Sequence, residues 1–239
     1  PDSMSRERRT VLRALGAEAG APLPLLLMNS FATADATQEH LEDTGHLGMG
    51  PEVVRTFDQR VAMRLTLDGE TFLTDQGEPS LYGPGHGDFL DALRDAGLVD
   101  WLRRRGVRYV TLCNVDNLGA RPDPVVIGHH VERGRAMTVE LVDKDPGDKG
   151  GAPALVGGHL EIVEDFRFPE DFDADRIPVF NTNTFVFSMN TLARVHPLDW
   201  FTVVKAVQGR KAVQFERLVG QVTAFEEAAY LRVPRSRFL

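Results

Sequence analysis

The segment RYVTLCNVDNLGA (residues 108–120) joins a short apolar run to a cluster of amides and a carboxylate. Val110 and Leu112 have strand character, and the run stops at Asn114-Val115-Asp116-Asn117. Such a run is typical of a buried parallel strand in an α/β sheet, a fold that binds ligands beyond the carboxyl ends of its strands. A carboxylate there can hold a divalent metal or a sugar hydroxyl. An Asx-rich turn with Gly119 as turn former is the competing interpretation.

Strand-like runs alternate with helical patterns along most of the chain. Asp123 and Pro124 form a typical helix start, with a capping side chain followed by proline at the first helical position. Helices are predicted over residues 5–18, 35–43, 88–105 and 123–133, and strands over 25–30, 53–57, 137–142, 160–163 and 178–188. The residues after 188 have mixed helical character. This alternation favours a mostly parallel sheet covered by helices on both faces.

A second polar cluster, Gly85-His86-Gly87-Asp88, opens directly into the predicted helix over residues 88–105. Glycines let the backbone approach a ligand closely, and a helix N-terminus offers unpaired N–H groups to an anion. His86 would add a hydrogen bond to a phosphate oxygen. The competing interpretation is an ordinary turn in which Asp88 is the N-cap of the helix.

Charge and cysteine content narrow the range of partners. A net charge of −8 argues against a nucleic-acid-binding or anionic-membrane surface. Cys113 is the only cysteine, which excludes an intrachain disulfide and fits a reducing cytoplasm. No apolar run approaches the ~20 residues that cross a bilayer, and PDSMSRERRT lacks the apolar core of a secretory signal. We therefore expect a cytoplasmic protein without nucleic-acid or membrane partners.

Seven segments together resemble the UTP–glucose-1-phosphate uridylyltransferases (UDP-glucose pyrophosphorylases), in the order of that family and over nearly the whole chain. They are PLLLMNSF (24–31), TFDQ (56–59), GPGHGDF (83–89), YVTLCNVDNLGA (109–120), KGG (149–151), FNTN (180–183) and VPRSRFL (233–239). The resemblance implies a Rossmann-like, GT-A-like nucleotide-sugar transferase core with a mostly parallel mixed sheet flanked by helices. It also implies one catalytic-core domain over residues 1–239.

The same resemblance implies roles for individual residues. Gln59 and Gly85 would contact the uridine nucleotide. His86 would contact the sugar phosphate and Asp116 would hold Mg²⁺ between the phosphates, so these two are the expected catalytic residues. The expected sugar-binding residues are Asn114, Gly151, Glu164 and Asn183.

The implied reaction joins UTP and glucose-1-phosphate into UDP-glucose and releases pyrophosphate. An oxygen of glucose-1-phosphate attacks the α-phosphorus of UTP in line with the departing pyrophosphate. This chemistry needs positioning and charge neutralisation more than a protein nucleophile, which suits a site of amides, glycines and one carboxylate.

Three departures from the family pattern are visible. The family pattern leads us to expect a glycine-rich GGLGT-like loop before residue 1, and a phosphate-contacting lysine and a C-terminal domain after VPRSRFL, and residues 1–239 contain no match to them. The residues after Gln59 read RVAMRL where a VPR-like run is expected. The sequence is therefore either the central part of the enzyme or a shortened, non-catalytic relative that binds sugar nucleotides. A UDP-N-acetylhexosamine pyrophosphorylase is a further alternative.

Overall fold

The structure is a computed structural model that describes residues 2–148, 150–173 and 176–238. Lys149 of the KGG segment and Leu239 of VPRSRFL lie outside the described residues. The chain forms two compact units, each built from separate stretches of sequence. Unit 1 comprises residues 1–23, 99–196 and 220–239, and unit 2 comprises residues 24–98 and 197–219.

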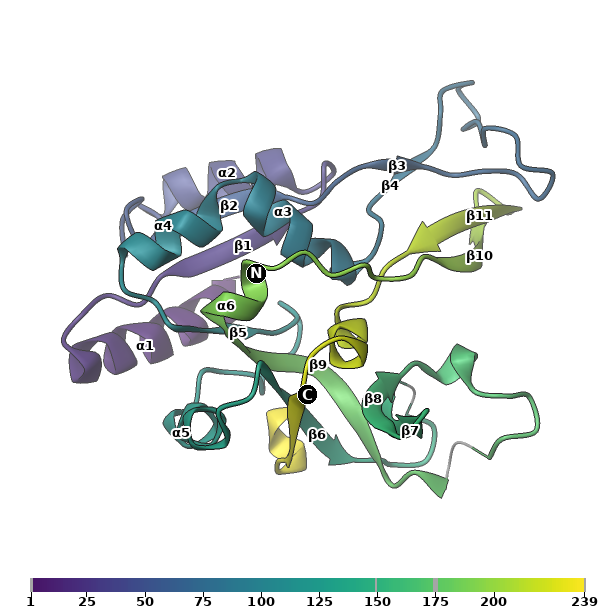
Figure 1. The fold of residues 1–239 in the computed structure, drawn as a ribbon. Helices are drawn as coiled ribbons and strands as arrows, with labels where there is room; N and C mark the ends of the chain where they lie inside the picture. Colours follow the sequence, from purple (N-terminus) through teal and green to yellow (C-terminus); the bar gives the residue numbers. More distant parts are fainter. Residues whose placement is uncertain (1, 149, 174–175, 239) are drawn as a thin grey trace. The chain divides into compact units, whose positions relative to one another are not determined.

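Unit 1 is built around a mixed four-stranded sheet with the strand order β12-β6-β9-β5 (Figure 1). Its strands are β5 (Tyr109–Leu112), β6 (Met137–Asp143), β9 (Val179–Ser188) and β12 (Ala228–Arg232). A separate hairpin pairs β7 (Ala152–Val156) with β8 (His159–Val163). The helices are α1 (Asp2–Ala19), α5 (Pro124–Arg133) and α6 (Met189–Leu192), and α4 (Leu98–Arg104) leads in from unit 2.

The prediction of a mostly parallel sheet is wrong for the described strands. Only β1 with β2 and β6 with β12 pair in parallel among them. β9 runs antiparallel to both of its neighbours, so β5 is a half-buried end strand with an antiparallel partner instead of a buried parallel strand. The α/β class and the mixed character of the sheet are confirmed.

Helix α5 follows the local sequence signals closely. The Asp123 side chain accepts a hydrogen bond from the Val125 N–H at 2.8 Å, and Pro124 occupies the first turn. Val126 buries this helix against Val142 of β6 and Phe180 of β9. The predicted start and extent of the helix are confirmed.

Unit 2 pairs β1 (Leu25–Asn29) in parallel with β2 (Val54–Asp58), and α2 (Ala34–Asp43) packs on them through Leu41. Two short strands, β3 (Ala62–Met63) and β4 (Leu81–Tyr82), form a second pair. The loop after β4 leads through the short 3₁₀ turn η1 (His86–Asp88) into α3 (Phe89–Asp95).

Two predictions about helices are corrected in or beside this unit. The helix predicted over 88–105 is interrupted, because Gly97 adopts a left-handed φ of 68° between α3 and α4. The mixed helical character expected after residue 188 is wrong over much of that stretch. Residues there form the antiparallel hairpin β10 (Phe201–Val207) and β11 (Arg210–Glu216), and then β12.

Within the described residues, no helix combines the length and apolar character needed to cross a bilayer.

Candidate functional site

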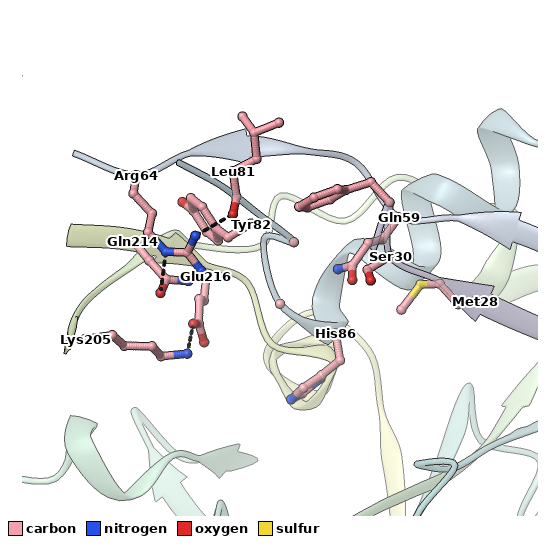
Figure 2. A pocket seen from close by; sticks show the side chains of 13 residues that line it. Met28, Ser30, Gln59, Arg64, Leu81, Tyr82, His86, Lys205, Gln214 and Glu216 are labelled. Atoms are coloured by element: carbon pink, nitrogen blue, oxygen red, sulfur yellow. Dashed lines mark hydrogen bonds and ion pairs between the residues drawn. The ribbon is translucent and has the colours of Figure 1, made fainter. Parts of the chain in front are cut away.

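A cavity of about 460 Å³ lies within unit 2. It contains the three residues that were predicted to meet the nucleotide and the sugar phosphate. Figure 2 shows Gln59, Ser30 and His86 toward one end of the cavity. Lys205, Gln214 and Glu216 of the β10–β11 hairpin lie toward the other end. Its lining is Met28, Ser30, Phe31, Gln59, Arg64, Leu81, Tyr82, Gly83, Gly85, His86, Lys205, Gln214 and Glu216. Backbone, amide, imidazole and ammonium groups in one cavity suit a polar, anionic ligand.

The glycines of this cavity wall are required by close packing. A Cβ on Gly83 would overlap the Gln59 amide, and a Cβ on Gly85 would lie 2.5 Å from the Arg217 carbonyl oxygen. Gly85 also has φ 85°, a conformation that side chains rarely adopt. Exposed backbone therefore forms this part of the wall.

His86 is held as a neutral imidazole. The Val219 N–H donates to His86 Nδ1 at 3.1 Å, so Nδ1 is an acceptor and carries no proton. Burial lowers the pKa of His86 from 6.5 to about 4, although the Glu216 carboxylate acts in the opposite direction. The proton therefore resides on Nε2, which leaves one N–H available to a ligand.

Asp88 occupies the N-cap position of α3, as the competing interpretation expected, but its side chain does not cap the helix. No capping hydrogen bond links its side chain to α3, and the side chain is fully buried. Asp88 Oδ2 accepts from the Arg60 backbone N–H at 2.6 Å, and Oδ1 accepts from Arg217 at 2.6 Å. The N-cap position is therefore confirmed, whereas the carboxylate joins three separate segments of unit 2 instead of capping the helix.

The β10–β11 hairpin contributes cavity residues that the sequence interpretation missed, namely Lys205, Gln214 and Glu216. Lys205 Nζ lies 2.5 Å from Glu216 Oε1. A signal was present: two seven-residue runs with strand-forming residues, FTVVKAV and RKAVQFE, are separated by the two residues Gln208-Gly209. Both turn residues have positive φ, as a two-residue hairpin turn requires.

In unit 1, a bulge in β9 brings Asn183 to Asn114. Between Val139 and Leu141 of β6, the partner strand advances from Phe185 to Asn181, so β9 carries extra residues there. Asn183 lies in that excess with φ 55°, and its Nδ2 donates to Asn114 Oδ1 at 2.5 Å. Bulges of this kind commonly redirect side chains beside functional sites.

The other end of the Asn183 amide has no donor among the described residues. Its Oδ1 is buried and accepts no hydrogen bond there. A buried unpaired acceptor costs ~1–3 kcal/mol, and a ligand hydroxyl or amide would supply the missing donor.

Gly151 and Glu164 are neighbours in the same unit. A Cβ on Gly151 would lie 2.9 Å from Glu164 Oε1, and the Gly151 carbonyl accepts from the Asn181 N–H at 2.7 Å. Burial raises the pKa of Glu164, against the opposing charge of Arg167. Hydrogen bonds and packing therefore connect three of the family-like segments, at Gly151, Asn181–Asn183 and Asn114.

Asp116 lies in an exposed bend two residues beyond Asn114. No group of three or more His, Cys, Asp and Glu side chains that could hold a metal occurs in the described part of the chain. Mg²⁺ commonly keeps several waters and binds one or two carboxylates together with substrate phosphates. The lone Asp116 carboxylate fits a Mg²⁺ ion that arrives with a nucleotide.

Behind this bend, Gly119 packs against the chain at Arg237. A Cβ on Gly119 would lie 2.5 Å from the Arg237 carbonyl carbon. The Arg237 guanidinium forms two 2.7 Å hydrogen bonds with Glu140, a carboxylate only 1% exposed. It also contacts Asp123 at 3.2 Å.

Nearly the whole chain matches one characterised family. The model of the UTP–glucose-1-phosphate uridylyltransferase family matches residues 10–239. A protein of that name from Pyrus pyrifolia is 32% identical over 235 residues, which cover 92% of this chain and 49% of that protein. The chain therefore spans about half the length of the curated relatives it matches.

Solved structures share the fold. One from Entamoeba histolytica, titled for UDP-N-acetylglucosamine pyrophosphorylase, has a TM-score of 0.85 at 18% identity and covers 97% of this chain and 65% of its own. A Leishmania major UDP-glucose pyrophosphorylase variant in complex with UDP-glucose has a TM-score of 0.80 at 25% identity, covering 98% of this chain and 56% of its own.

Proposed function

The chain belongs to the UTP–glucose-1-phosphate uridylyltransferase family. On that premise we propose that it is a nucleotidyltransferase forming UDP-glucose and pyrophosphate from UTP and glucose-1-phosphate. We further propose that both units belong to one Rossmann-like, GT-A-like catalytic core. Its location would be cytoplasmic, without nucleic-acid or membrane partners.

The cavity of unit 2 carries this proposal. The Gln59 amide and the backbone at Gly85 suit a uridine nucleotide, because an amide and exposed backbone can both donate to and accept from a base. The neutral His86 offers Nε2–H to a phosphate oxygen of the sugar phosphate. These are the groups that a uridylyltransferase needs at one wall of its site.

The sugar contacts are proposed in unit 1. The unpaired Asn183 Oδ1 would accept from a glucose hydroxyl, beside Asn114. Gly151 has no side chain between its backbone and Glu164, and we propose that both would meet the sugar, with the Glu164 carboxylate accepting from a further hydroxyl. Neutral amides suit a hydroxylated ligand because they add hydrogen bonds without charge.

Asp116 would hold Mg²⁺, which when bound offsets negative charge on the phosphates. The residues of this chain would otherwise act by orientation. His86 would hold the sugar phosphate in line with the α-phosphorus, and Gln59 would fix the nucleotide. Well-oriented reactants gain several kcal/mol of the barrier without a covalent intermediate.

Two other functions remain testable. A UDP-N-acetylhexosamine pyrophosphorylase is favoured by the fold likeness to the Entamoeba histolytica structure. A non-catalytic sugar-nucleotide-binding protein would keep the same cavity and lose turnover.

The deciding experiment measures pyrophosphate release by this chain from UTP and Mg²⁺ with glucose-1-phosphate, and in parallel with N-acetylglucosamine-1-phosphate. We expect turnover with glucose-1-phosphate and at least tenfold lower kcat/KM with the N-acetylated sugar. The reverse preference would indicate the hexosamine enzyme. Calorimetric binding of UDP-glucose without turnover of either sugar would reject the catalytic proposal in favour of the non-catalytic relative.

A further inference from the structure

Arg217, which directly follows β11, contacts the loop of residues 83–88 in unit 2 through both its backbone N–H and its carbonyl group. Its backbone N–H donates to the Pro84 carbonyl at 2.9 Å, and its carbonyl accepts from the Gly87 N–H at 2.8 Å. A Cβ on Gly87 would lie 2.6 Å from the Arg217 carbonyl carbon. Loop and strand end are therefore in direct backbone contact, with no side chain between them.

The Arg217 side chain is anchored independently of this backbone contact. It donates to Asp88 at 2.6 Å and to Asp91 at 2.8 Å, and its guanidinium lies 4.6 Å from the centre of the Trp200 ring. Although burial acts to raise it, the pKa of Asp91 lies below its ordinary value because of the hydrogen bond and charge of Arg217. Two carboxylates on η1 and α3 thus fix the strand end.

That anchoring controls the next hydrogen bond along the chain. Val219, two residues beyond Arg217, directs its N–H at His86 Nδ1. A backbone N–H can only donate, so this contact excludes a proton on Nδ1 and leaves it on Nε2. If the segment shifted by about an ångström, the bond would break and both tautomers would become accessible.

We propose that Arg217 is a positioning residue for His86. Its two carboxylate contacts hold the 217–219 segment so that the Val219 amide keeps the imidazole in the neutral Nε2–H form, oriented to donate to the substrate. The inference rests on the proposed function only in naming that substrate a sugar phosphate. The role of Arg217 itself follows from hydrogen bonds within unit 2.

The first test is long-range ¹H–¹⁵N NMR of the ¹⁵N-labelled 239-residue chain, which reports the two imidazole nitrogens separately. The His86 signals are identified by their loss in His86→Gln. At pH 7 we expect a bare Nδ1 and a protonated Nε2. A proton on Nδ1, or a fast mixture of both tautomers in the unsubstituted chain, would overturn the inference.

The second test removes the anchor. In Arg217→Gln we expect His86 to show a mixture of tautomers. This change leaves the buried Asp88 with only the more distant Arg60 guanidinium, 3.8 Å away, and can prevent folding by itself. Asp88→Asn/Arg217→Gln removes the uncompensated buried charge but does not restore the two guanidinium–carboxylate contacts, so it should fold and show the same mixture. A single Nε2–H tautomer in the folded double variant would contradict the proposal.

Arg60→Gln is the matched control. The Arg60 guanidinium pairs with Asp91 and Asp95 and, at the longer distance of 3.8 Å, with Asp88. Its side chain is 48% exposed and does not anchor the 217–219 segment. We expect the wild-type tautomer in this variant. A mixture as large as that of Arg217→Gln would assign the effect to the charge of the carboxylate cluster and reject the positioning role.

Kinetics supply the last readout. Loss of a residue that orients a functional side chain typically costs 10–100-fold, so we expect kcat of Arg217→Gln to fall about tenfold while KM for UTP changes less than about twofold. A rise in KM alone would contradict positioning of His86. An unsubstituted chain without turnover but with the expected tautomer behaviour would reject the proposed function alone. Turnover by the unsubstituted chain, together with an unchanged Nε2–H tautomer of His86 in the folded Arg217 variants, would reject this inference alone.

Discussion

Two loops, residues 83–88 in unit 2 and residues 114–120 in unit 1, are supported in the same way but present their functional side chains differently. In each loop a glycine packs closely against the backbone of an arginine: Gly87 against Arg217, and Gly119 against Arg237. Each arginine is in turn held by two carboxylates.

The difference lies at the tip of each loop. His86 is fixed by a backbone hydrogen bond, whereas Asp116 is exposed and the described residues give its carboxylate no hydrogen-bond partner. The first loop is preorganised by the protein, and the second keeps a carboxylate available to an ion or ligand. Substitutions should therefore separate effects on stability from effects on turnover.

The largest expected effect is on turnover alone. Asp116→Asn should lower Mg²⁺-dependent kcat by about 10³-fold, because a preorganised charge contact of this kind is worth ~3–4 kcal/mol in the transition state. Thermal unfolding should shift by less than ~2 °C, since the side chain is exposed. Asp171→Asn, an exposed carboxylate in the same unit, is the control. Activity near wild type in Asp116→Asn would remove Asp116 from the metal role.

Next comes the arginine behind the exposed loop. Arg237→Gln leaves Glu140 buried without its cation, and breaking such a pair typically costs ~3–5 kcal/mol of unfolding free energy. Glu140→Gln/Arg237→Gln should recover most of that loss, because two neutral amides can still hydrogen bond. Urea unfolding of both variants measures the difference. Equal stability of the single variant and the wild type would show that the two loops are not supported alike.

Glycine substitutions test the tight packing itself. Gly87→Ala should destabilise the chain by roughly 3 kcal/mol, because its Cβ would lie 2.6 Å from Arg217 backbone that cannot move freely. A Cβ on Gly128 would meet no heavy atom within 4 Å beyond its own stretch of α5, so Gly128→Ala should stabilise by ~0.5–1 kcal/mol. Chemical denaturation that ranks the two variants in the opposite order would contradict the packing argument.

The smallest expected effect is the pH dependence contributed by His86. Its pKa is about 4 in the folded chain and 6.5 ordinarily, so the unfolded chain binds more protons between these values. The contribution to stability is complete above pH 6.5 and is lost as the pH falls toward 4. The slope should be at most roughly 1 kcal/mol per pH unit for this partly exposed group. Urea midpoints of His86→Gln between pH 4.5 and 7 should vary less steeply than those of the wild type, and identical slopes would contradict the assignment.

Local signals predicted elements well and pairings poorly. Asp123 and Pro124 identify the start of α5 because a cap acts within a few residues. The antiparallel partner of β5 is β9, some seventy residues later, and nothing in RYVTLC encodes that choice. The β10–β11 hairpin was predictable from two strand-forming runs separated by Gln208-Gly209, but a helical interpretation of the same stretch obscured it.

In the candidate site, too, the sequence identifies some residues, whereas others depend on contacts between distant segments. Gln59, Gly85 and His86 could be named together through the family resemblance, and in the structure they line one cavity. Arg217 could not be named, because its contact with Asp88 joins residues 129 positions apart. Nor could the β9 bulge, since the left-handed Asn183 depends on how two strands fall out of register.

The discontinuity of unit 2 has a consequence for the nascent chain. Asp88 leaves the ribosome 129 residues before Arg217, a delay on the order of 10 s at ordinary rates of synthesis. Throughout that interval the Asp88 carboxylate lacks the Arg217 guanidinium, and the loop of residues 83–88 lacks its hydrogen bonds to the Arg217 backbone. The loop around His86 can therefore close only after the intervening segment of unit 1, residues 99–196, has been made.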